Sequence, residues 1–442
     1  MKYSAVHYQS LLEEVNTLPV RGRISRVVGL TLEGFVENCV MGDLCELTRR
    51  GEEKIFAEVV GFRDKTVLLM PLADLTGVGP GTSVLNRGGQ AEVPVGEAFL
   101  GRVIDGLGNP IDGKGPIVAS CHYPLYASPP SHLRRQRISE PLDLGIRSIN
   151  SLLTVGRGQR MGIFAGSGVG KSVLLGMIAR FTTADVNVIA LIGERGREVK
   201  EFIERDLQEE GLNRSVVVVA TSDQPPLVRR RGAFLAMSIA EYFRDRHQHV
   251  LLMMDSLTRF AHAQREIGLA IGEPPTTKGY TPSVFSLLPK LLERAGTTPH
   301  QGSITGLFSV LVDGDDLNDP IPDTTRSILD GHIVLSRELA ISNQYPAIDV
   351  LMSISRVMPD IVPPEQIENA RRFSELLAAY RKAEDLILIG AYKPGSSPKV
   401  DEAISKWDAL QGCLKQEMNT PVLFDESVDH IRRVVTERVF KK

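Results

Sequence analysis

The chain has 442 residues, 42% of them hydrophobic and 24% charged, a composition typical of a globular protein with two or three domains. Its formal net charge of −3 gives no general attraction to nucleic acid or anionic lipid, so we expect no nucleic-acid partner. Four cysteines without CxxC spacing indicate neither a zinc site nor a disulfide framework, and they favour a reducing cytoplasm.

The first third of the chain shows three successive sequence patterns. Residues 1–20 contain apolar side chains at helical spacing, which predicts an amphipathic helix that packs on its own domain or docks a partner or membrane surface. Short β-like runs punctuated by glycine predict a small β-barrel over residues 21–92. Residues 93–150 are rich in turn signals, and we interpret them as a linker region at the start of the next domain.

The centre of the chain, residues 93–362, alternates apolar runs with helical patterns. Near-continuous apolar runs predict strands buried on both faces of a parallel α/β sheet, with ligands bound beyond the carboxyl ends of the strands. These runs cover residues 188–192, 216–220, 250–254 and 303–312. The remaining residues, 363–442, show helical patterns and predict a C-terminal α-helical domain.

Residues 161–172, Met-Gly-Ile-Phe-Ala-Gly-Ser-Gly-Val-Gly-Lys-Ser, have the pattern of a P-loop, although Ala165 stands where the usual pattern has its first glycine. Glycines let the backbone turn tightly, so that amide N–H groups at a helix start point at phosphate oxygens. Lys171 is expected to bridge the β- and γ-phosphates of ATP, and the Ser172 hydroxyl to ligate Mg²⁺. The predicted nucleotide-binding residues are Gly166, Ser167, Gly168, Val169, Gly170, Lys171, Ser172 and Val173.

Two acidic residues follow apolar runs and are candidates for the chemistry. Asp255 ends the run 250–254 and is expected to hold Mg²⁺. Glu194 follows the run 188–192, and a carboxylate at the end of a strand adjacent to the P-loop strand is able to orient the attacking water. Arg195 is then placed to meet phosphate charge, although a charged loop entering a helix is the alternative interpretation.

Three further features remain open from chemistry alone. Arg356 follows an apolar segment and is either a surface residue or an arginine that neutralises γ-phosphate charge across a subunit boundary. Tyr345 either stacks on adenine or serves packing. The turn-rich segment 271–282, with Lys278 and Tyr280 at its tip, is typical of a loop used for motion or contact.

Together these motifs resemble the family of the catalytic β subunit of rotary ATP synthases, and within it the export ATPases of type III secretion. The resemblance extends from about residue 21 onward, and the flagellar member is the most similar. The family-wide motifs are 193–198, 220–226, 255–261 and 345–349, and the export-type segments are 266–275, 283–285, 327–337 and 389–392.

The resemblance implies a homohexameric ring with ATP and Mg²⁺ at each subunit interface. Position by position, it implies that Glu194 is the catalytic carboxylate and that Arg195 contacts phosphate. Arg356 then reaches into the neighbour's site, and Tyr345 stacks on adenine. The segment around Lys278 and Tyr280 is expected to face the central channel of the ring, whereas the basic segment 134–137 has no clear match.

The resemblance also implies partners and a location. We expect a stator-like regulator at the N-terminal helix, a central stalk protein, export chaperone–substrate complexes at the C-terminal domain, and a membrane export gate. The protein is then cytoplasmic and peripheral to the inner-membrane export apparatus, where it releases or unfolds chaperone-bound cargo. The alternatives are a virulence export ATPase, a rotary F- or V-type subunit, an RNA translocase and a noncatalytic nucleotide-binding scaffold.

Overall fold

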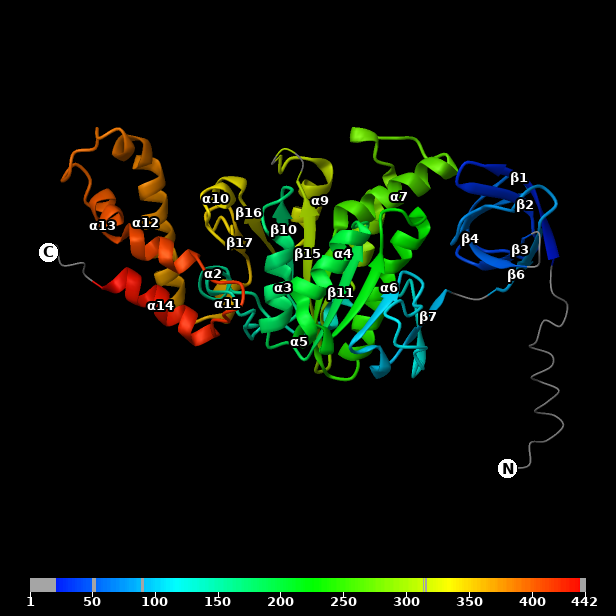
Figure 1. The fold of residues 1–442 in the computed structure, drawn as a ribbon, viewed down its shortest axis with the longest axis horizontal. Helices are drawn as coiled ribbons and strands as arrows, with labels where there is room; N and C mark the ends of the chain where they lie inside the picture. Colours follow the sequence, from blue (N-terminus) through cyan, green and yellow to red (C-terminus); the bar gives the residue numbers. More distant parts are fainter. Residues whose placement is uncertain (1–20, 50–52, 89–90, 313, 315, 438–442) are drawn as a thin grey trace, which may run out of the picture.

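The computed structural model describes residues 21–49, 53–88, 91–312, 314 and 316–437. The predicted helix in residues 1–20 lies outside this range. Three parts follow one another along an elongated molecule, with a β-barrel at one end, a sheet covered by helices in the middle and a helical bundle at the other end (Figure 1).

The N-terminal part is a closed barrel with strand order β1-β2-β5-β4-β3-β6, which confirms the predicted barrel. Buried and exposed residues alternate in the first half of β1, so that the Ile24 side chain points into the barrel interior. Leu32, Cys45 and Leu47 lie in the same interior. The strands are β1 Arg21–Val28, β2 Thr31–Phe35, β3 Leu44–Thr48, β4 Lys54–Arg63, β5 Thr66–Pro71 and β6 Ser83–Asn86.

The middle part is built on a sheet with strand order β17-β16-β10-β15-β13-β11-β12-β8, with β14 paired to β15. Strands β8 to β16 along this path are parallel, and β14 and β17 are antiparallel. Every residue of β11 and β12 is buried, as the continuous apolar runs predicted. The strands are β8 Arg102–Asp105, β10 Arg160–Ala165, β11 Val186–Ile192, β12 Ser215–Ala220, β13 His249–Asp255, β14 Gly296–Thr297, β15 Ser303–Leu311, β16 Gly331–Leu335 and β17 Ile354–Ser355.

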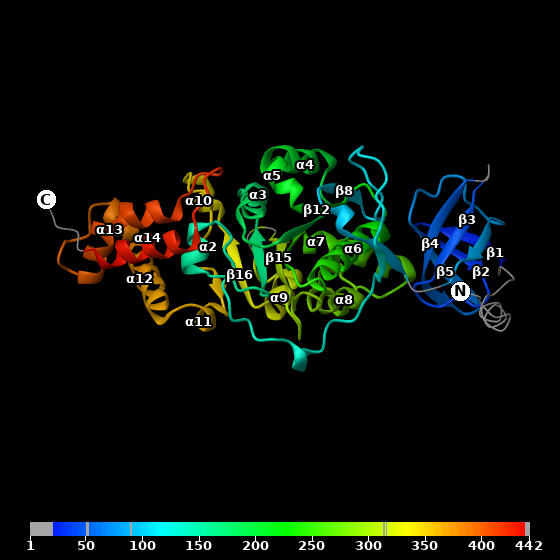
Figure 2. The same ribbon diagram turned by 90° about the horizontal axis from the view of Figure 1, so that it is seen from below.

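The region 93–150 is more than a linker. Its strand β8 forms an edge of the central sheet, and β7 (Glu92–Val95) pairs with β9 (Cys121–Pro124). These four-residue strands are hidden in the sequence by the turn signals on either side of them. After β9 the chain runs along one edge of the middle part to α2 (Figure 2).

Helices cover both faces of the sheet, and three more form the C-terminal bundle (Figures 1 and 2). Stacking of Tyr380 on Trp407, with ring centroids 3.5 Å apart, joins the first two bundle helices. In the described part of the chain, no helix combines the length and the apolar character needed to cross a membrane. The α-helices are α2 Arg147–Leu152, α3 Lys171–Phe181, α4 Gly196–Glu201, α5 Gln208–Asn213, α6 Pro226–Arg244, α7 Leu257–Ile271, α8 Pro282–Leu292, α9 Pro320–Ile328, α10 Arg337–Ile341, α11 Met358–Ile361, α12 Pro364–Leu388, α13 Pro398–Leu414 and α14 Phe424–Thr436; shorter helical turns are η1 Glu97–Phe99, η2 His132–Arg134, η3 Phe202–Leu207 and η4 Thr277–Gly279.

Candidate active site

The glycine-rich turn lies between β10 and α3, as the sequence predicted. Gly168 and Gly170 have φ angles of 79° and 85°, in the left-handed region that side chains disfavour. Gly170 is the N-cap of α3, which begins at Lys171. The turn therefore presents unpaired amide N–H groups and the positive end of a helix dipole, which together suit a phosphate group.

Lys171 lies between the two predicted acidic residues. Its ammonium group contacts Asp255 Oδ1 directly and lies 3.8 Å from Glu194 Oε1. Asp255 ends β13 and is buried, and the Ser309 hydroxyl on β15 donates a hydrogen bond of 2.5 Å to the same Oδ1. One lysine, two carboxylates and a serine thus meet at the carboxyl edge of the sheet.

The position of Glu194 differs from the prediction in one respect. Glu194 follows β11, which we expected to neighbour the P-loop strand, but β15 and β13 lie between β10 and β11. Contact is possible because the long Lys171 side chain extends across the ends of the intervening strands. Strand order depends on tertiary packing, so the local pattern around Glu194 contains no information about it.

The Glu194 carboxyl has a raised pKa. Burial and the nearby charge of Asp255 raise its pKa to about 7, although Lys171 opposes the shift. Glu198, on the first turn of α4, adds to the rise through a hydrogen bond to Glu194. A group that titrates near neutrality is able to accept a proton from water under ordinary conditions.

The donors around Lys171 fit a magnesium ion held together with a nucleotide. Ser172, Glu194 and Asp255 line one small cavity. Within the described ranges, no group of three or more His, Cys, Asp or Glu side chains could hold a metal unaided. Mg²⁺ takes oxygen ligands and is usually bound through one or two protein oxygens, substrate phosphates and water. The Ser172 hydroxyl and the Asp255 carboxylate supply such oxygens.

Tyr345 lies beside the P-loop, whereas the Arg195 side chain is largely exposed to solvent. A methyl group built on Gly170 would be 3.3 Å from the Tyr345 ring, which is 44% exposed. The ring is therefore available for stacking next to the start of α3. The Arg195 side chain is 80% exposed and lies 3.6 Å from Glu198, outside the contacts of Lys171.

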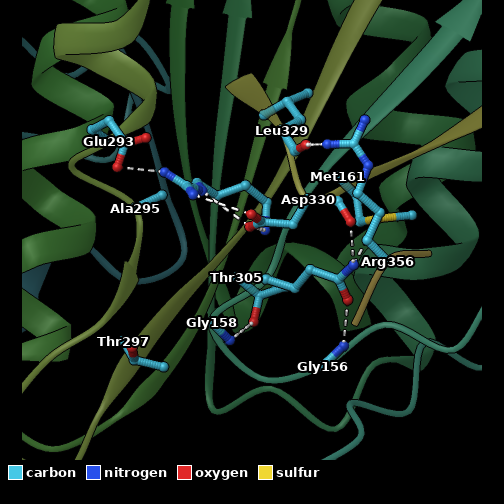
Figure 3. Close-up of polar contacts among 12 residues, drawn as sticks. Gly156, Gly158, Met161, Glu293, Ala295, Thr297, Thr305, Leu329, Asp330 and Arg356 are labelled. Atoms are coloured by element: carbon cyan, nitrogen blue, oxygen red, sulfur yellow. Dashed lines mark hydrogen bonds and ion pairs between the residues drawn. The ribbon is translucent and has the colours of Figure 1, made fainter. Parts of the chain in front are cut away.

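Arg356 lies at the opposite end of the sheet from its own P-loop. Its backbone N–H donates to the Asp330 carbonyl, and the Asp330 N–H donates to the carbonyl of Arg160, the first residue of β10. The P-loop follows Ala165, five residues along β10, or about 16 Å at about 3.3 Å per residue. Arg356 is exposed there, and one guanidinium nitrogen donates to the Leu329 carbonyl at 3.2 Å (Figure 3).

The structure adds residues that the sequence did not single out. Ser309 contacts Asp255 only because β15 and β13 are neighbours, and no local motif marks it. Glu198 and Arg259 do have a local signal, since each lies on the first turn of a helix that follows a site strand. Arg259 packs on Gly193, next to Glu194, where an added methyl would approach the Arg259 side chain to 2.6 Å.

The segment 271–282 is only partly a loop tip. Lys278 forms an ion pair of 2.6 Å with Asp319, but Tyr280 is buried at 5% exposure and lies 3.1 Å from His262. Tyr280 thus anchors the segment to α7, in contrast to the exposed position that we expected. An aromatic residue inside a run of prolines, glycines and threonines gives no indication of which side it faces.

The chain matches three protein-family models in sequence order. Residues 24–88 match the beta-barrel domain of the ATP synthase alpha/beta family, and residues 145–355 match its nucleotide-binding domain. Residues 362–433 match the C-terminal domain of the EscN ATPase of type III secretion. The three matches coincide with the barrel, the central sheet and the C-terminal bundle.

Similar proteins cover almost the whole chain. A flagellum-specific ATP synthase of Bacillus subtilis is 56% identical over 92% of this chain and 93% of its own length. A type 3 secretion system ATPase of Xanthomonas euvesicatoria is 50% identical over 97% and 98%. The assembled EscN ATPase of enteropathogenic E. coli is similar in structure, with a TM-score of 0.88, 45% identity and coverage of 94% and 100%. A second EscN structure, in complex with its central stalk EscO, has a TM-score of 0.87, 44% identity and the same coverage.

Proposed function

The chain belongs to the ATP synthase alpha/beta family and, within it, is an ATPase of the flagellar and type III secretion group; we propose that it works as a Mg²⁺-dependent homohexamer that drives flagellar protein export. The one observation that carries the proposal is the separation of Arg356 from the Lys171, Glu194 and Asp255 cluster along β10. An arginine that cannot reach its own site is available to a neighbour's site. A head-to-tail ring repeats that contact at every interface.

The residues of the site divide the chemistry among them. The amides of the glycine-rich turn and the ammonium group of Lys171 bind and neutralise the phosphates of ATP. Ser172 and Asp255 would hold Mg²⁺, which supplies charge neutralisation at the phosphate oxygens. Ionised Glu194 orients a water for in-line attack on the γ-phosphorus and takes its proton as the bond to the ADP oxygen breaks. Arg356 from the next subunit offsets the charge of the transferring phosphoryl group.

The remaining proposed roles are those that the family resemblance implies. Tyr345, beside Gly170, stacks on the adenine ring, and Arg195 turns from solvent toward phosphate when nucleotide binds. Residues 1–20 bind a stator-like regulator. The segment 271–282 faces a central stalk protein, and the similar EscN ATPase supports such a partner because it has been solved in complex with its central stalk EscO. The C-terminal bundle receives chaperone–substrate complexes, and the ring meets the export gate at the cytoplasmic side of the inner membrane. The flagellar assignment rests on the higher identity of 56% to a flagellar relative, against 50% to a type 3 secretion ATPase.

A mixing experiment tests the shared site. The donor chain has Lys171→Ala, which disables its own P-loop but leaves Arg356 intact, and the receiver chain has Arg356→Ala. Each alone should lose ATPase activity by about a thousandfold or more, because each lacks one half of every site. Mixed in equal amounts, they should regain about a quarter of the wild-type activity, because random assembly pairs about that fraction of interfaces productively.

The result that would overturn the proposal is a mixture as inactive as its components, although affinity capture of a tagged donor chain co-purifies the untagged receiver chain in rings. Activity of Arg356→Ala close to wild type would overturn it as well. Mixing would not restore activity if each site were complete within one subunit. The experiment therefore distinguishes a site shared between subunits from a site within one subunit.

A further inference from the structure

A network of partly buried polar contacts holds Arg356 in place near the amino end of β10 (Figure 3). Asp330 is the centre of this network. Its backbone carbonyl accepts from the Arg356 N–H at 3.0 Å, and the carbonyl of the preceding residue, Leu329, accepts from the Arg356 guanidinium at 3.2 Å. The position of the Leu329–Asp330 turn therefore sets the position of Arg356.

The turn is fixed to β10 by Arg160. The Asp330 carboxylate accepts from Nε and Nη2 of Arg160, both at 3.1 Å, and from its backbone N–H at the same distance. Such a two-pronged pair sets direction as well as distance. Both side chains are largely shielded from solvent, at 15% exposure for Arg160 and 27% for Asp330.

Gln159 fixes the other side of the arginine. This fully buried amide donates to the Asp330 carbonyl at 3.2 Å and to the hydroxyl of Ser355, the residue before Arg356, at 3.0 Å. Ser355 in turn donates to the Thr154 carbonyl at 2.7 Å. Arg356 and the residue before it are thus tied, through Asp330 and Gln159, to the point where β10 begins.

The basic segment 134–137 supports the network from outside. Arg135 is only 13% exposed, and its guanidinium donates to the carbonyls of Glu293 and, at 2.8 Å, Ala295. The Glu293 carboxylate lies 2.5 Å from Arg160. Arg135 therefore holds the end of α8 against the Arg160–Asp330 pair, which gives this segment a structural partner within the chain.

We propose that Asp330, held by Arg160, is a positioning residue for catalysis in the neighbouring subunit, because it fixes the direction in which Arg356 is offered. The inference rests on the proposed function, since it requires that Arg356 act across the interface. Asp330 lies with Arg160 at the end of β10 opposite its own P-loop. A displacement of about 1 Å in a catalytic group costs about a hundredfold in rate. A loosened Leu329–Asp330 turn would therefore lower the rate of hydrolysis in the neighbouring site.

The mixed rings locate the effect. Asp330→Asn is added to the Lys171→Ala donor, whose own site is already inactive, and the donor is mixed with the Arg356→Ala receiver. The kcat of the mixture should fall about ten- to a hundredfold relative to the unmodified donor, with the KM for ATP unchanged, because the receiver's P-loop is intact. Asp330→Asn placed in the receiver instead should leave the rescue unchanged, since that chain has no Arg356 to position.

A matched control removes the same chemistry elsewhere. Arg102 and Asp112, on β8 and the turn that follows it, form a similar two-pronged pair at 2.7 and 2.9 Å. Asp112→Asn in the donor should leave the rescue unchanged. Where the Asp330→Asn donor does not enter rings, Arg160→Lys replaces it, because lysine keeps the charge but loses the two-pronged geometry.

Equal rescue by the donors with and without Asp330→Asn would overturn the inference. An equal loss of ATPase activity when Asp330→Asn is placed in the donor or in the receiver would overturn it as well. Absence of rescue with the unmodified donor is a different result, because it overturns the proposed function first. The two failures are therefore distinguishable in one set of mixtures.

Discussion

Glu194→Gln should stabilise the nucleotide-free protein at the same time as it abolishes turnover. In the folded protein, burial and the Asp255 charge raise the pKa of Glu194 to about 7 from its ordinary 4.5. The folded state therefore binds this proton more tightly than the unfolded state does. The ionised form is the one that the fold disfavours, and it is the form that catalysis requires.

The sign and size follow from linkage. Below about pH 4.5 the carboxyl is protonated in both states and the shift has no consequence. Between about pH 4.5 and pH 7 the folded state holds more protons, so the free energy of unfolding falls as the pH rises. Above about pH 7 the penalty approaches about 3.5 kcal/mol, because raising a pKa from 4.5 to about 7 costs the ionised form about 1.4 kcal/mol for each tenfold change in proton affinity. The glutamine side chain does not ionise, so the Glu194→Gln protein does not incur this free-energy penalty.

The assay is chemical unfolding of both proteins without nucleotide at several pH values from 5 to 8. The stability advantage of Glu194→Gln should be small at pH 5 and grow to about 3 kcal/mol at pH 8. Glu198→Gln is a matched change on the first turn of α4. It removes only a minor contribution to the raised pKa of Glu194, so its stability advantage should grow less with pH. A pH-independent difference, or a Glu194→Gln protein that is less stable at pH 8, would refute the reasoning.

Three further predictions concern the same site. The kcat/KM for ATP should rise with pH through an apparent pKa near 7, because Glu194 must be ionised, and a profile flat from pH 6 to 8 would contradict this. Tyr345→Ala should weaken ATP binding by about 1–3 kcal/mol, measured by titration, whereas Tyr345→Phe keeps the ring and should bind normally. Ser309→Ala should lower the free energy of unfolding by about 1.5–3 kcal/mol, because it removes a hydrogen bond to the buried Asp255 carboxylate; an unchanged denaturation midpoint would rule out this contribution.

The parts of the site that could be predicted are those whose chemistry is local in sequence. The P-loop is predicted from a run of twelve residues, 161–172, because phosphate binding needs glycine, lysine and serine at fixed spacing. The structure has the expected strand-to-helix turn there. The barrel and the parallel sheet followed from short apolar runs and their spacing. Asp255 was found because it ends such a run.

The parts that could not be predicted depend on which strands become neighbours. Glu194 was assigned to a strand beside β10, yet two strands separate them. Ser309 reaches Asp255 through the pairing of β15 with β13, and Arg135 reaches Glu293 across some 160 residues of sequence. No local sequence pattern predicts these contacts, because they depend on how the whole domain packs.

One strand connects the two halves of the catalytic machinery. β10 leads into the glycine-rich turn at its carboxyl end, and its first residue, Arg160, holds Asp330 and thereby Arg356 at the other end. The strand is paired on both sides, with β15 and β16, so its residues cannot shift independently of the sheet. Both ends of β10 therefore keep fixed positions relative to the same sheet. In the proposed ring, the same strand in every subunit places its P-loop in one site and its Arg356 in the adjacent site, so the distance between the two is set by the length of β10.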